Sequence, residues 1–542
     1  MADKNILLVE PGYRNKYPPL GLMKIAQYHG LQGKRDRVRF VKGEDPTAYD
    51  TAWDRVYITT LFSFEWERTA RSIDYALDLV GGQAHRIFVG GIAASLMHDK
   101  YINEPRWRGV RFIKGLLGEA PAISLQLDPF DEELYADDVN GKPIEDLTPD
   151  YSILEHISYE YPVSDAYFTY ASRGCVRKCA FCGVPALEGM QRDTNSLTSV
   201  VEGVNALYGE KRDLILMDNN VVASANFKEI IAEIIDLGFE RGAKLKRGRY
   251  ELQRRVDFNQ GVDARILCKD PMYLQQLARI ALKPLRIAFD HLGLKKPYAQ
   301  AIRYSAEAGL TELSNYMLYN FKDSPQDLFE RMRLNVELNE ELDIRIFSFP
   351  MRYQPVNRQD RGHVGTNWNS YYLRSMQVIL QATHGIVSGA PEFFRKAFGD
   401  TYEEYESILL RPHHYIFNRY WYEQFDGRAE FEAFQTVMGK LSDGERTELL
   451  VYLCSRDKND YEADLSELAA GRLRDAARFF VPMSKSDEAR IWEAQRRRRV
   501  EDISTYLVPE DERVEDAGLT DEDVPPEPKA HRTIKNITQI YA

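Results

Sequence analysis

The chain has 542 residues, of which 44% are hydrophobic and 28% charged, and its formal net charge at pH 7 is −12. This composition is typical of a globular protein of roughly two to four domains, and it excludes a strongly basic chain that binds nucleic acid or membrane over its whole length. The longest apolar runs are far shorter than the ~20 residues of a membrane span, and five cysteines, three of them clustered, do not suit a disulfide framework. We therefore expect a cytoplasmic protein without a membrane segment, and the opening MADKN shows no apolar segment of a secretory signal.

Strand and helix patterns alternate in the first part of the chain. Apolar strand patterns occur at 5–10, 55–62, 86–91 and 110–115, and helical patterns at 19–29 and 66–80. This alternation predicts a Rossmann-like domain with a parallel sheet over residues 1–127. Ligands of such sheets lie beyond the carboxyl ends of the strands, so Gly90 and Gly91 suit the close approach of a ligand. A tight turn before a helix explains the two glycines equally well.

A second alternating series spans residues 164–358, after a stretch at 128–163 that is rich in acids, prolines and turn dipeptides and that we interpret as a linker. Its strand patterns lie at 166–172, 214–218, 256–263, 285–290, 312–320 and 343–349. Helical patterns lie between them, at 195–209, 226–238, 270–281, 297–308 and 324–339. These units predict a partial (β/α)6 barrel of the TIM type, whose active residues belong at the carboxyl ends of the strands.

The remaining residues have a different character. Residues 359–500 are mainly helical in pattern and rich in aromatics, which predicts a packed α-domain. Residues 501–542 are acidic, contain prolines and have few large apolar side chains, so we expect a flexible tail. The predicted fold class is therefore α/β, with a Rossmann-like domain, a barrel and a mainly α C-terminal domain in that order.

Three of the five cysteines, Cys175, Cys179 and Cys182, follow the first strand of the predicted barrel in the run CVRKCAFC. A structural zinc site needs four ligands, and no histidine stands near this run. A redox CxxC pair would use only the last two thiols and leave the first without a role. Three thiolates suit a [4Fe–4S] cluster with one iron that the protein does not ligate. Cys268 and Cys454 are isolated, and we interpret them as ordinary buried thiols.

The spacing CxxxCxxC, with Phe181 before the third cysteine, resembles the cluster motif of the radical S-adenosylmethionine (SAM) superfamily, and the resemblance extends over residues 164–355. It implies that Cys175, Cys179 and Cys182 hold [4Fe–4S] and that the open iron binds the amino and carboxylate groups of SAM. In this family an electron from the cluster cleaves SAM to methionine and a 5′-deoxyadenosyl radical, which abstracts a substrate hydrogen. A reductant such as flavodoxin or ferredoxin is the implied partner.

Polar residues follow the predicted barrel strands. Asp218, Asn219 and Asn220 end the second strand, and their oxygens suit the SAM ammonium, although helix capping explains them too. At the ends of later strands lie further candidates for contact with SAM or substrate: Gln260, Asp263, Arg265, Asp290 and Asn320. A structural ion pair is the alternative for the third-strand residues of this set. By the resemblance, Phe181 and Gly183 stand beside the cofactor, where a small residue lets the backbone approach SAM.

Four N-terminal segments resemble the cobalamin-binding domain of class B radical SAM enzymes: NILLVEPGYRNKYPPLGLMKIAQYHG, YITTLF, FVGGIAASL and FIKGLLGEA. The resemblance implies cobalamin contacts within these segments at Pro18, Pro19, Leu20, Gly21, Gly90 and Gly91. The chain lacks the DxHxxG motif through which other cobalamin domains ligate cobalt by histidine. A Rossmann-like domain that no longer binds the cofactor is the alternative.

With cobalamin bound, the resemblance implies methylation of an unactivated carbon, with methylcobalamin as the donor. Without it, hydrogen abstraction leads to rearrangement, cyclisation or epimerisation, or to modification of RNA or a nucleotide. A non-catalytic sensor of SAM or cobalamin is the alternative outside the enzymes. The substrate stays open among small molecules, peptides and RNA, and the basic stretch 242–255 is either a solvated hairpin or a contact for the phosphates of an anionic substrate.

Overall fold

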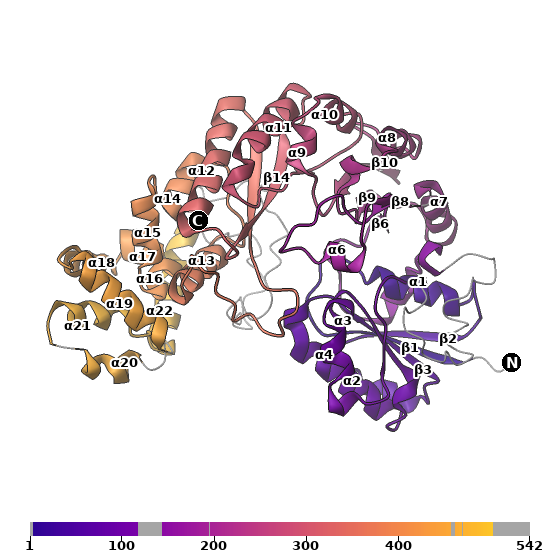
Figure 1. Ribbon diagram of the computed structural model, residues 1–542, viewed down its shortest axis with the longest axis horizontal. Helices are drawn as coiled ribbons and strands as arrows, with labels where there is room; N and C mark the ends of the chain where they lie inside the picture. Colours follow the sequence, from indigo (N-terminus) through magenta and orange to yellow (C-terminus); the bar gives the residue numbers. More distant parts are fainter. Residues whose placement is uncertain (1–3, 118–143, 195, 457–460, 469, 502–542) are drawn as a thin grey trace. The chain divides into compact units, whose positions relative to one another are not determined.

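The computed structural model describes residues 4–117, 144–194, 196–456, 461–468 and 470–501 (Figure 1). The chain divides into two compact units. The first comprises Met1–Ala288, Lys296–Ser314 and Tyr353–His363, and the second comprises Phe289–Lys295, Asn315–Arg352 and Val364–Ala542. This division runs through the predicted barrel instead of around it, so the domain limits expected from the sequence stay predictions.

A five-stranded parallel sheet forms the first part of the first unit, with the strand order β2-β1-β3-β4-β5. Its strands are β1 (Asn5–Glu10), β2 (Arg37–Lys42), β3 (Arg55–Thr60), β4 (Ile87–Gly91) and β5 (Arg111–Phe112). Its helices are α1 (Leu20–His29), α2 (Trp66–Leu79), α3 (Ile92–Leu96) and α4 (His98–Ile102). The Rossmann-like prediction is confirmed. It missed β2, because charged residues alternate there with apolar ones and only Phe40 and Val41 are buried.

The strand order fixes where a ligand of this sheet belongs. β1 pairs with β2 on one side and with β3 on the other, so the connections leave β1 in opposite directions. Doubly wound sheets bind ligands at this switch point, outside the carboxyl ends of the strands. The loop 11–19 follows β1 there, and the short helix η2 (Ser63–Glu65) follows β3. The YPPLG segment (residues 17–21) therefore lies at the ligand edge of the sheet.

Residues 144–163, the described part of the predicted linker, pack against both neighbours. They contain two short 3-10 helices, η5 (Ile144–Asp146) and η6 (Ser152–His156). Nδ1 of His156 accepts the Phe40 N–H of β2 over 3.1 Å, and the Tyr151 hydroxyl donates to the Ala166 carbonyl over 2.7 Å. Ala166 is the first residue of β6, the first barrel strand. Residues 144–163 therefore make hydrogen bonds to both the N-terminal sheet and the barrel.

The predicted barrel strands lie in two sheets. β6 (Ala166–Thr169), β9 (Asp213–Leu216) and β12 (Arg255–Phe258) form the first, which is parallel and has the order β12-β9-β6. β13 (Leu285–Arg286), β14 (Glu312–Tyr319) and β15 (Arg345–Arg352) form the second, in the order β13-β14-β15. A parallel bridge between Val262 and Ile287 continues the first sheet into β13. The α/β class and the partial barrel are confirmed, and the described strands do not close into a full ring.

Helices and two hairpins separate the barrel strands. The helices are α6 (Val184–Leu187), α7 (Leu197–Tyr208), α8 (Phe227–Asp236), α9 (Ala264–Leu267), α10 (Met272–Leu277), α11 (Lys295–Glu307) and α12 (Pro325–Leu342). The hairpins are β7 (Ser172–Arg173) with β8 (Arg192–Asp193), and β10 (Lys244–Arg247) with β11 (Tyr250–Gln253). Local sequence sets the helix starts: Ser196 caps α7, and Ser324 forms a capping box with Asp327 at the start of α12.

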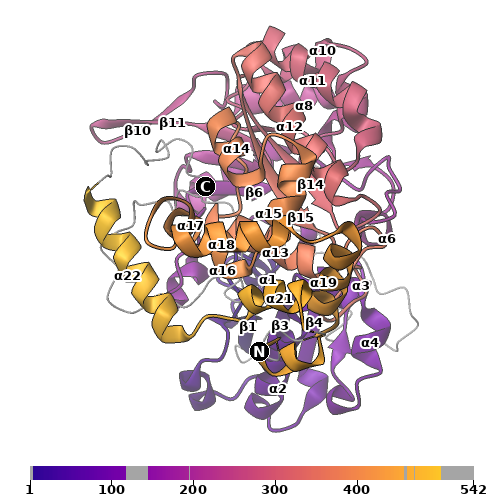
Figure 2. The same ribbon diagram turned by 90° about the vertical axis from the view of Figure 1, so that its left-hand side faces the viewer.

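The second unit continues with helices whose core is aromatic. They are α13 (Ser370–Ala382), α14 (Pro391–Phe398), α15 (Tyr402–Leu409), α16 (His413–Phe417), α17 (Arg419–Gln424), α18 (Arg428–Gly439), α19 (Asp443–Ser455), α20 (Tyr461–Asp464), α21 (Arg472–Ala477) and α22 (Lys485–Glu501). α13 packs on α16, and α17 packs on α16 and α18 (Figure 2). The Tyr415 ring lies 4.1 Å from that of Tyr422 and 5.4 Å from that of Phe434, so the aromatic run is a packed core, as predicted.

Parts of all five predicted segments lie outside the described residues: 1–3 and 118–127 of the Rossmann-like domain, 128–143 of the linker, 195 of the barrel, 457–460 and 469 of the helical domain, and 502–542 of the tail. None of the helices in the described part of the chain has the length and apolar character that a bilayer crossing requires.

Candidate functional site

The three cysteines of the CVRKCAFC run lie in one loop between β7 and α6, which we call the cysteine loop (residues 174–183). None of the three forms a disulfide with another described cysteine, and all are partly exposed. The Arg177 N–H donates to Cys175 Sγ and the Val184 N–H to Cys182 Sγ, each over 3.4 Å. Hydrogen bonds from the backbone to cysteine sulfurs are a feature of protein iron–sulfur sites, so these donors suit ligating cysteines.

Gly174 shapes the start of the cysteine loop. Its φ is +75°, and a Cβ there would stand 2.3 Å from the carbonyl oxygen of Met190. The Cys175 N–H donates to the Gly189 carbonyl over 3.2 Å. Only glycine tolerates both this backbone angle and this close approach. The backbone of residues 174–175 therefore lies against that of residues 189–190, and this contact closes the loop.

Asp218, at the end of β9, holds the turn that leads into the cysteine loop. Its carboxylate accepts the Ala171 N–H over 2.9 Å and both the N–H and the hydroxyl of Ser172, the hydroxyl over 2.7 Å. The side chain is fully buried, and burial raises the pKa of Asp218 to about 6 against the hydrogen bonds, which lower it. In the structure, three groups of the protein thus donate hydrogen bonds to the Asp218 carboxylate. The sequence predicts the SAM ammonium as the donor instead.

Asn219 belongs to a second set of hydrogen bonds, around Glu188. Oε2 of Glu188 accepts from Asn219 Nδ2 over 2.9 Å, from the Gly174 N–H over 2.9 Å and from Arg173 Nε over 3.1 Å. Glu188 follows α6, so its carboxylate joins the end of β9 to both sides of the cysteine loop. Asn219 acts here as a donor, and its predicted contact with SAM stays a prediction.

The third set connects Asn220 to Asp263. Oδ1 of Asn220 accepts the Asp263 N–H over 3.2 Å, whereas its Nδ2 is buried and has no hydrogen-bond partner among the described residues. The Asp263 carboxylate accepts Arg177 Nε over 2.6 Å and Arg265 Nε over 2.7 Å. Burial disfavours this charge, but the hydrogen bonds from Arg265 and Arg177 outweigh it and hold the pKa of Asp263 below its usual value. The ion pair that the sequence offers as an alternative is therefore present, and it includes Arg177 of the cysteine loop.

Arg265 also lies beside the cysteine loop, because its guanidinium interacts electrostatically with Cys179. Burial lowers the pKa of Arg265, but the interactions with Asp263 and then Cys179 raise it by more, so the pKa lies above its ordinary value. A permanent positive charge therefore stands beside the middle cysteine. The sequence gives no sign of this contact, because residues 179 and 265 lie far apart along the chain.

The other cysteines and Phe181 add little to the site. Cys268 and Cys454 are partly exposed, so their prediction as buried thiols is wrong. Cys268 follows the last turn of α9, and Cys454 lies near the end of α19, where both sit close to the surface. Phe181 is partly exposed in the cysteine loop. Gln260 is exposed directly after β12, and its predicted contact with SAM or substrate stays a prediction.

Gly183, at the end of the cysteine loop, has a role that the sequence did not predict. A Cβ there would stand 2.8 Å from Leu96 Cδ1 of α3. The glycine therefore makes room for a helix of the N-terminal sheet, whereas we expected it to make room for SAM. α3 packs on α6, so the glycine turn of the N-terminal sheet and the cysteine loop lie side by side.

Asp290 and Asn320 belong to the second unit. Asn320 is fully buried with a φ of +69°, and its Oδ1 accepts the Gly365 N–H over 2.7 Å. A Cβ on Gly365 would stand 2.7 Å from the Asn320 carbonyl oxygen, so the two residues form a close turn contact. Asp290 is partly exposed and follows Phe289, whose carbonyl accepts Arg331 Nη1 over 2.9 Å. Asn320 directly follows β14, whereas Asp290 lies four residues beyond the end of β13 and not at the strand end that the sequence predicted. The contact of both residues with SAM stays a prediction.

Sequence reasoning missed an ion pair between two barrel strands. Arg286 of β13 binds Asp257 of β12 with two hydrogen bonds of 2.8 Å, and both side chains are buried. It also missed the roles of Arg177 and Glu188 in holding the cysteine loop. A charged residue inside an otherwise apolar strand, as in VDF and LRI, is the signal that marks such a pair, because a buried charge needs a partner.

The ligand edge of the N-terminal sheet is open at β3 and β4. Gly91 has a φ of +101°, and a Cβ there would stand 2.4 Å from the Thr60 carbonyl oxygen, so the fold itself requires this glycine. Phe62 stacks on Phe64 at 5.1 Å, and Phe62 and Ile92 are both exposed. Exposed apolar side chains beyond the carboxyl ends of parallel strands suit a flat, largely apolar ligand.

At the ends of β1 and β2, side chains of the protein occupy the ligand edge. Glu10 and Lys42, the last residues of these strands, pair over 2.7 Å, and the Tyr161 hydroxyl donates to Glu10. The Lys42 ammonium lies 4.4 Å from the ring centroid of Tyr159 and 5.6 Å from that of Tyr13. Burial raises the pKa of Glu10 and lowers that of Lys42. A ligand therefore belongs on the β3 and β4 side of the edge.

The loop into α1 carries the other residues predicted to contact cobalamin. Pro18 is buried, Pro19 and Leu20 are partly exposed, and Gly21 is exposed. The ring of the neighbouring Tyr17 meets that of Phe168 in β6 at 6.0 Å, so the loop packs on the barrel. The contact of these residues, and of Gly90, with cobalamin stays a prediction.

The basic stretch 242–255 forms the hairpin β10–β11. Arg247 binds Asp165 with two nitrogens, each at 2.7 Å, and Lys244 binds Glu251 over 3.0 Å. Asp165 directly precedes β6, so the hairpin lies at the amino ends of the strands, away from the end that carries the cysteines. This arrangement favours the solvated hairpin over a phosphate contact for a substrate at the cysteine loop.

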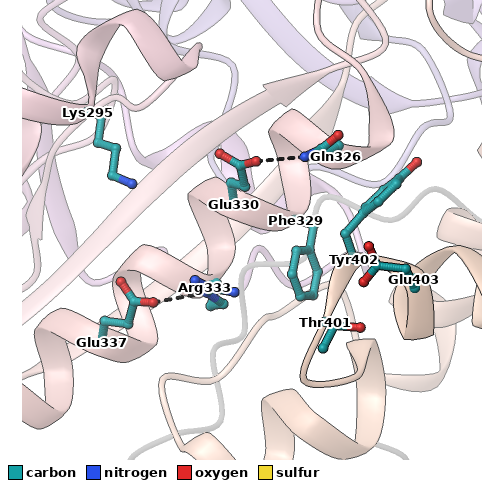
Figure 3. Close-up of a pocket in the computed structure, with 9 residues that line it drawn as sticks. All are labelled: Lys295, Gln326, Phe329, Glu330, Arg333, Glu337, Thr401, Tyr402 and Glu403. Atoms are coloured by element: carbon teal, nitrogen blue, oxygen red, sulfur yellow. Dashed lines mark hydrogen bonds and ion pairs between the residues drawn. The ribbon is translucent and has the colours of Figure 1, made fainter.

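A separate cavity of about 250 Å³ lies in the second unit, along α12 and the start of α15 (Figure 3). Two pairs of its polar side chains are hydrogen-bonded: Arg333 donates to Glu337 over 2.9 Å, and Gln326 donates to Glu330 over 3.0 Å. None of the residues predicted for the cofactor site lines this cavity.

Within the described residues, no three His, Cys, Asp or Glu side chains lie close enough together to hold a metal ion. A [4Fe–4S] cluster differs from a single ion, because each thiolate binds a different iron atom. The fit of the cysteine loop to a cluster therefore depends on its exposure and its donors.

No protein-family model matches the chain, and no curated protein sequence matches it. Two solved structures of TsrM from Kitasatospora setae, a radical S-adenosylmethionine methyltransferase, match with a TM-score of 0.44 and 15% identity over 66% of this chain. The match covers 77% of the TsrM chain with cobalamin and a [4Fe–4S] cluster, and 75% of the one with tryptophan substrate and the SAM analogue aza-SAM. OxsB, a cobalamin-dependent S-adenosylmethionine radical enzyme, matches with a TM-score of 0.46 and 13% identity over 88% of this chain and 83% of its own.

Proposed function

We propose that the chain is a radical SAM enzyme that holds a [4Fe–4S] cluster on Cys175, Cys179 and Cys182 and methylates an unactivated carbon with the help of cobalamin. The cysteine loop carries the proposal, because it presents three partly exposed thiols and is held by polar side chains from the ends of β9 and β12. When bound, such a cluster takes SAM on its open iron and supplies the electron that cleaves SAM to methionine and a 5′-deoxyadenosyl radical. A low-potential one-electron donor such as flavodoxin or ferredoxin is the expected partner.

The donors around the sulfurs fit three thiolates. Backbone N–H groups point to Cys175 and Cys182, and the Arg265 guanidinium contacts Cys179. Hydrogen bonds and positive charge near the ligating sulfurs are features of protein-bound iron–sulfur clusters. The chain's own residues therefore prepare this loop for an iron–sulfur cluster.

Asn220 is the residue that best fits a contact with SAM. Its Nδ2 is buried without a partner among the described residues, and a buried donor left unpaired costs about 1–3 kcal/mol. The SAM carboxylate offers a charged acceptor for such a donor. We therefore assign Asn220 to the carboxylate, whereas the sequence made it a candidate for the ammonium.

Cobalamin fits the open edge of the N-terminal sheet. Phe62 and Ile92 each expose 40% of their surface at this edge, where the corrin would bind. α3 begins at Ile92 and meets the cysteine loop through Leu96 and Gly183. The residues that would hold cobalamin are therefore neighbours of those that would hold the cluster. Methylcobalamin, when bound, supplies the methyl group that the proposed reaction transfers.

The test of the cluster is anaerobic reconstitution of the full chain with iron and sulfide, followed by SAM and dithionite. We expect about four iron atoms per chain and the formation of 5′-deoxyadenosine, measured by mass spectrometry. Cys179→Ala should lose both, whereas Cys454→Ala, which removes a cysteine outside the loop, should keep both. A chain that holds the cluster but forms no 5′-deoxyadenosine supports the sensor alternative, and a chain that retains no iron contradicts the proposal.

The test of cobalamin is incubation with hydroxocobalamin, desalting and measurement of corrinoid absorbance. Ile92→Glu places a charge on the open edge and should lower the retained corrinoid several-fold. Ile102→Glu is the matched control, because Ile102 is also exposed but lies at the end of α4. Equal retention by the two variants contradicts this placement, and no retention by the wild type removes cobalamin while the cluster proposal stands.

A further inference from the structure

We infer that Arg265 tunes the cluster: held by Asp263, its guanidinium stabilises the reduced, more negative form of the iron–sulfur cluster bound at Cys179. The inference rests on the proposed function, because it concerns the cluster that this function requires. It gives Arg265 a role through a cluster ligand, in place of the predicted contact with SAM or substrate.

Arg265 is fixed by the start of α9, for which Asp263 is the N-cap. Oδ1 of Asp263 accepts the Arg265 N–H over 2.9 Å and Arg265 Nε over 2.7 Å. These two bonds restrain both the backbone and the side chain of Arg265. The guanidinium is thereby held on the carboxylate that also binds Arg177 of the cysteine loop, where its charge interacts with Cys179.

Arg177, inside the cysteine loop, shares the same carboxylate. Its Nε lies 2.6 Å from Asp263 Oδ2, while Arg265 uses Oδ1. The Asp263 N–H is anchored in turn on Asn220. Two guanidinium groups and one carboxylate leave a net positive charge beside the loop, since arginine stays protonated at every ordinary pH.

Such a charge acts on the redox equilibrium of a cluster. Reduction adds one electron to a site that its thiolates already make negative, so hydrogen bonds to sulfur and nearby cations raise the reduction potential. The side chains of Arg265 and Arg177 are each 35% exposed, and water screens part of their charge. We therefore expect loss of the Arg265 charge to change the ratio of reduced to oxidised cluster about tenfold at a fixed potential, which equals about 59 mV for one electron.

The three sulfurs are not equivalent in this respect. Cys175 and Cys182 receive backbone N–H donors, whereas Cys179 receives a charged side chain. A side-chain donor is lost by substitution and a backbone donor is not. A substitution of Arg265 can therefore change the reduction potential while all three cysteine ligands stay in place.

The test is an anaerobic redox titration of the reconstituted full chain with dithionite as reductant, followed by the EPR signal of the reduced cluster. Arg265→Gln removes the charge, and Arg265→Lys keeps it. Arg255→Gln is the matched control, because it removes an equal charge from the exposed start of β12, at the opposite end of that strand from the cysteines. Iron and sulfide are measured for every variant, which separates a lost cluster from a shifted potential.

We expect a lower midpoint potential in Arg265→Gln, by the tenfold ratio given above, and potentials close to wild type in Arg265→Lys and Arg255→Gln. Equal midpoints in the wild type and Arg265→Gln, with full iron in both, overturn the inference and leave the proposed function standing. If Arg265→Gln loses its iron, the midpoint potential of Arg265→Lys decides. A midpoint like that of the wild type supports a charge effect. A midpoint lowered by as much as the tenfold ratio predicts overturns the inference. A wild type that holds no cluster overturns the proposed function and the inference together.

Discussion

The hydroxyl of Tyr17 donates a hydrogen bond to Oδ1 of Asn259 over 2.7 Å. Tyr17 lies in the loop after β1, and Asn259 follows β12 and donates its own N–H to the Leu216 carbonyl of β9. The bond therefore connects the ligand edge of the N-terminal sheet to the carboxyl ends of two barrel strands. Both of these edges carry residues proposed to hold a cofactor.

Tyr17→Phe removes this bond and keeps the ring that packs on Phe168. We expect the free energy of unfolding to fall by about 1 kcal/mol, because one hydrogen bond is lost and the Asn259 oxygen loses a donor. Urea denaturation at neutral pH measures the change. Tyr49→Phe is the control, since Tyr49 is exposed and its hydroxyl can bond to water. Equal stability of both variants would contradict a role for the Tyr17 bond.

Gly183→Ala places a Cβ against Leu96, at the 2.8 Å distance given above. We expect a loss of about 0.5–1 kcal/mol in the free energy of unfolding, because the flexible, partly exposed Leu96 side chain must change its rotamer to make room. In a Leu96→Ala background the same substitution should cost much less, and a double-mutant cycle measures the difference. An equal cost in both backgrounds argues that Leu96 is not the reason for the glycine.

Asp218→Ala leaves the buried N–H groups of Ala171 and Ser172 without their acceptor. We expect a loss of about 2–4 kcal/mol in the free energy of unfolding, since each unpaired buried donor costs about 1–3 kcal/mol. The iron content after reconstitution should also fall, although all three cysteines are intact, because the turn before the cysteine loop is loosened. Asp236→Ala, an exposed residue at the end of α8, is the control. Full iron content in Asp218→Ala would show that the turn does not shape the loop.

The contact between His156 and Phe40 makes the fold sensitive to acid. Burial lowers the pKa of His156, so the folded chain binds fewer protons than the unfolded chain near the ordinary histidine pKa of about 6.5. The stability that this site contributes is complete above about pH 7 and is lost as the pH falls through the unfolded-state pKa.

We expect the free energy of unfolding of the wild type to fall between about pH 7 and pH 5.5, and that of His156→Gln to fall less over the same range. Hydrogen exchange at the Phe40 amide should become faster on acidification, since protonation of Nδ1 removes its acceptor. Parallel pH profiles of the two proteins would rule out His156 as the origin of this dependence.

Local patterns in the sequence were enough to predict several elements of the fold. The run NILLVE forms β1 with the expected bounds, and the cysteine run follows the first barrel strand as expected. β2 escaped prediction because RVRFVK sits at the edge of its sheet, where charged side chains on one face hide the apolar pattern.

The connections between residues far apart in the chain were beyond reach. Nothing local shows that Asp218 caps the turn before the cysteines, or that Arg265 meets Cys179, since both contacts depend on how β6, β9 and β12 stand beside one another. The Leu96 contact likewise gives Gly183 a reason that its place in the cysteine motif does not show. Residue types at strand ends thus predicted a polar site, while the partner of each residue came only from the fold.

The hydrogen bonds that hold the cysteine loop have a consequence for how the protein matures. The carboxylates of Asp218, Glu188 and Asp263 make these bonds without using a thiol, so the shape of the loop is set by the folding of the polypeptide. The entropy of ordering the loop is then lost during folding and not when iron arrives. An assembly factor that delivers the proposed cluster would meet a folded acceptor, and a chain that lost the proposed cluster to oxygen would keep a loop that can bind another without unfolding.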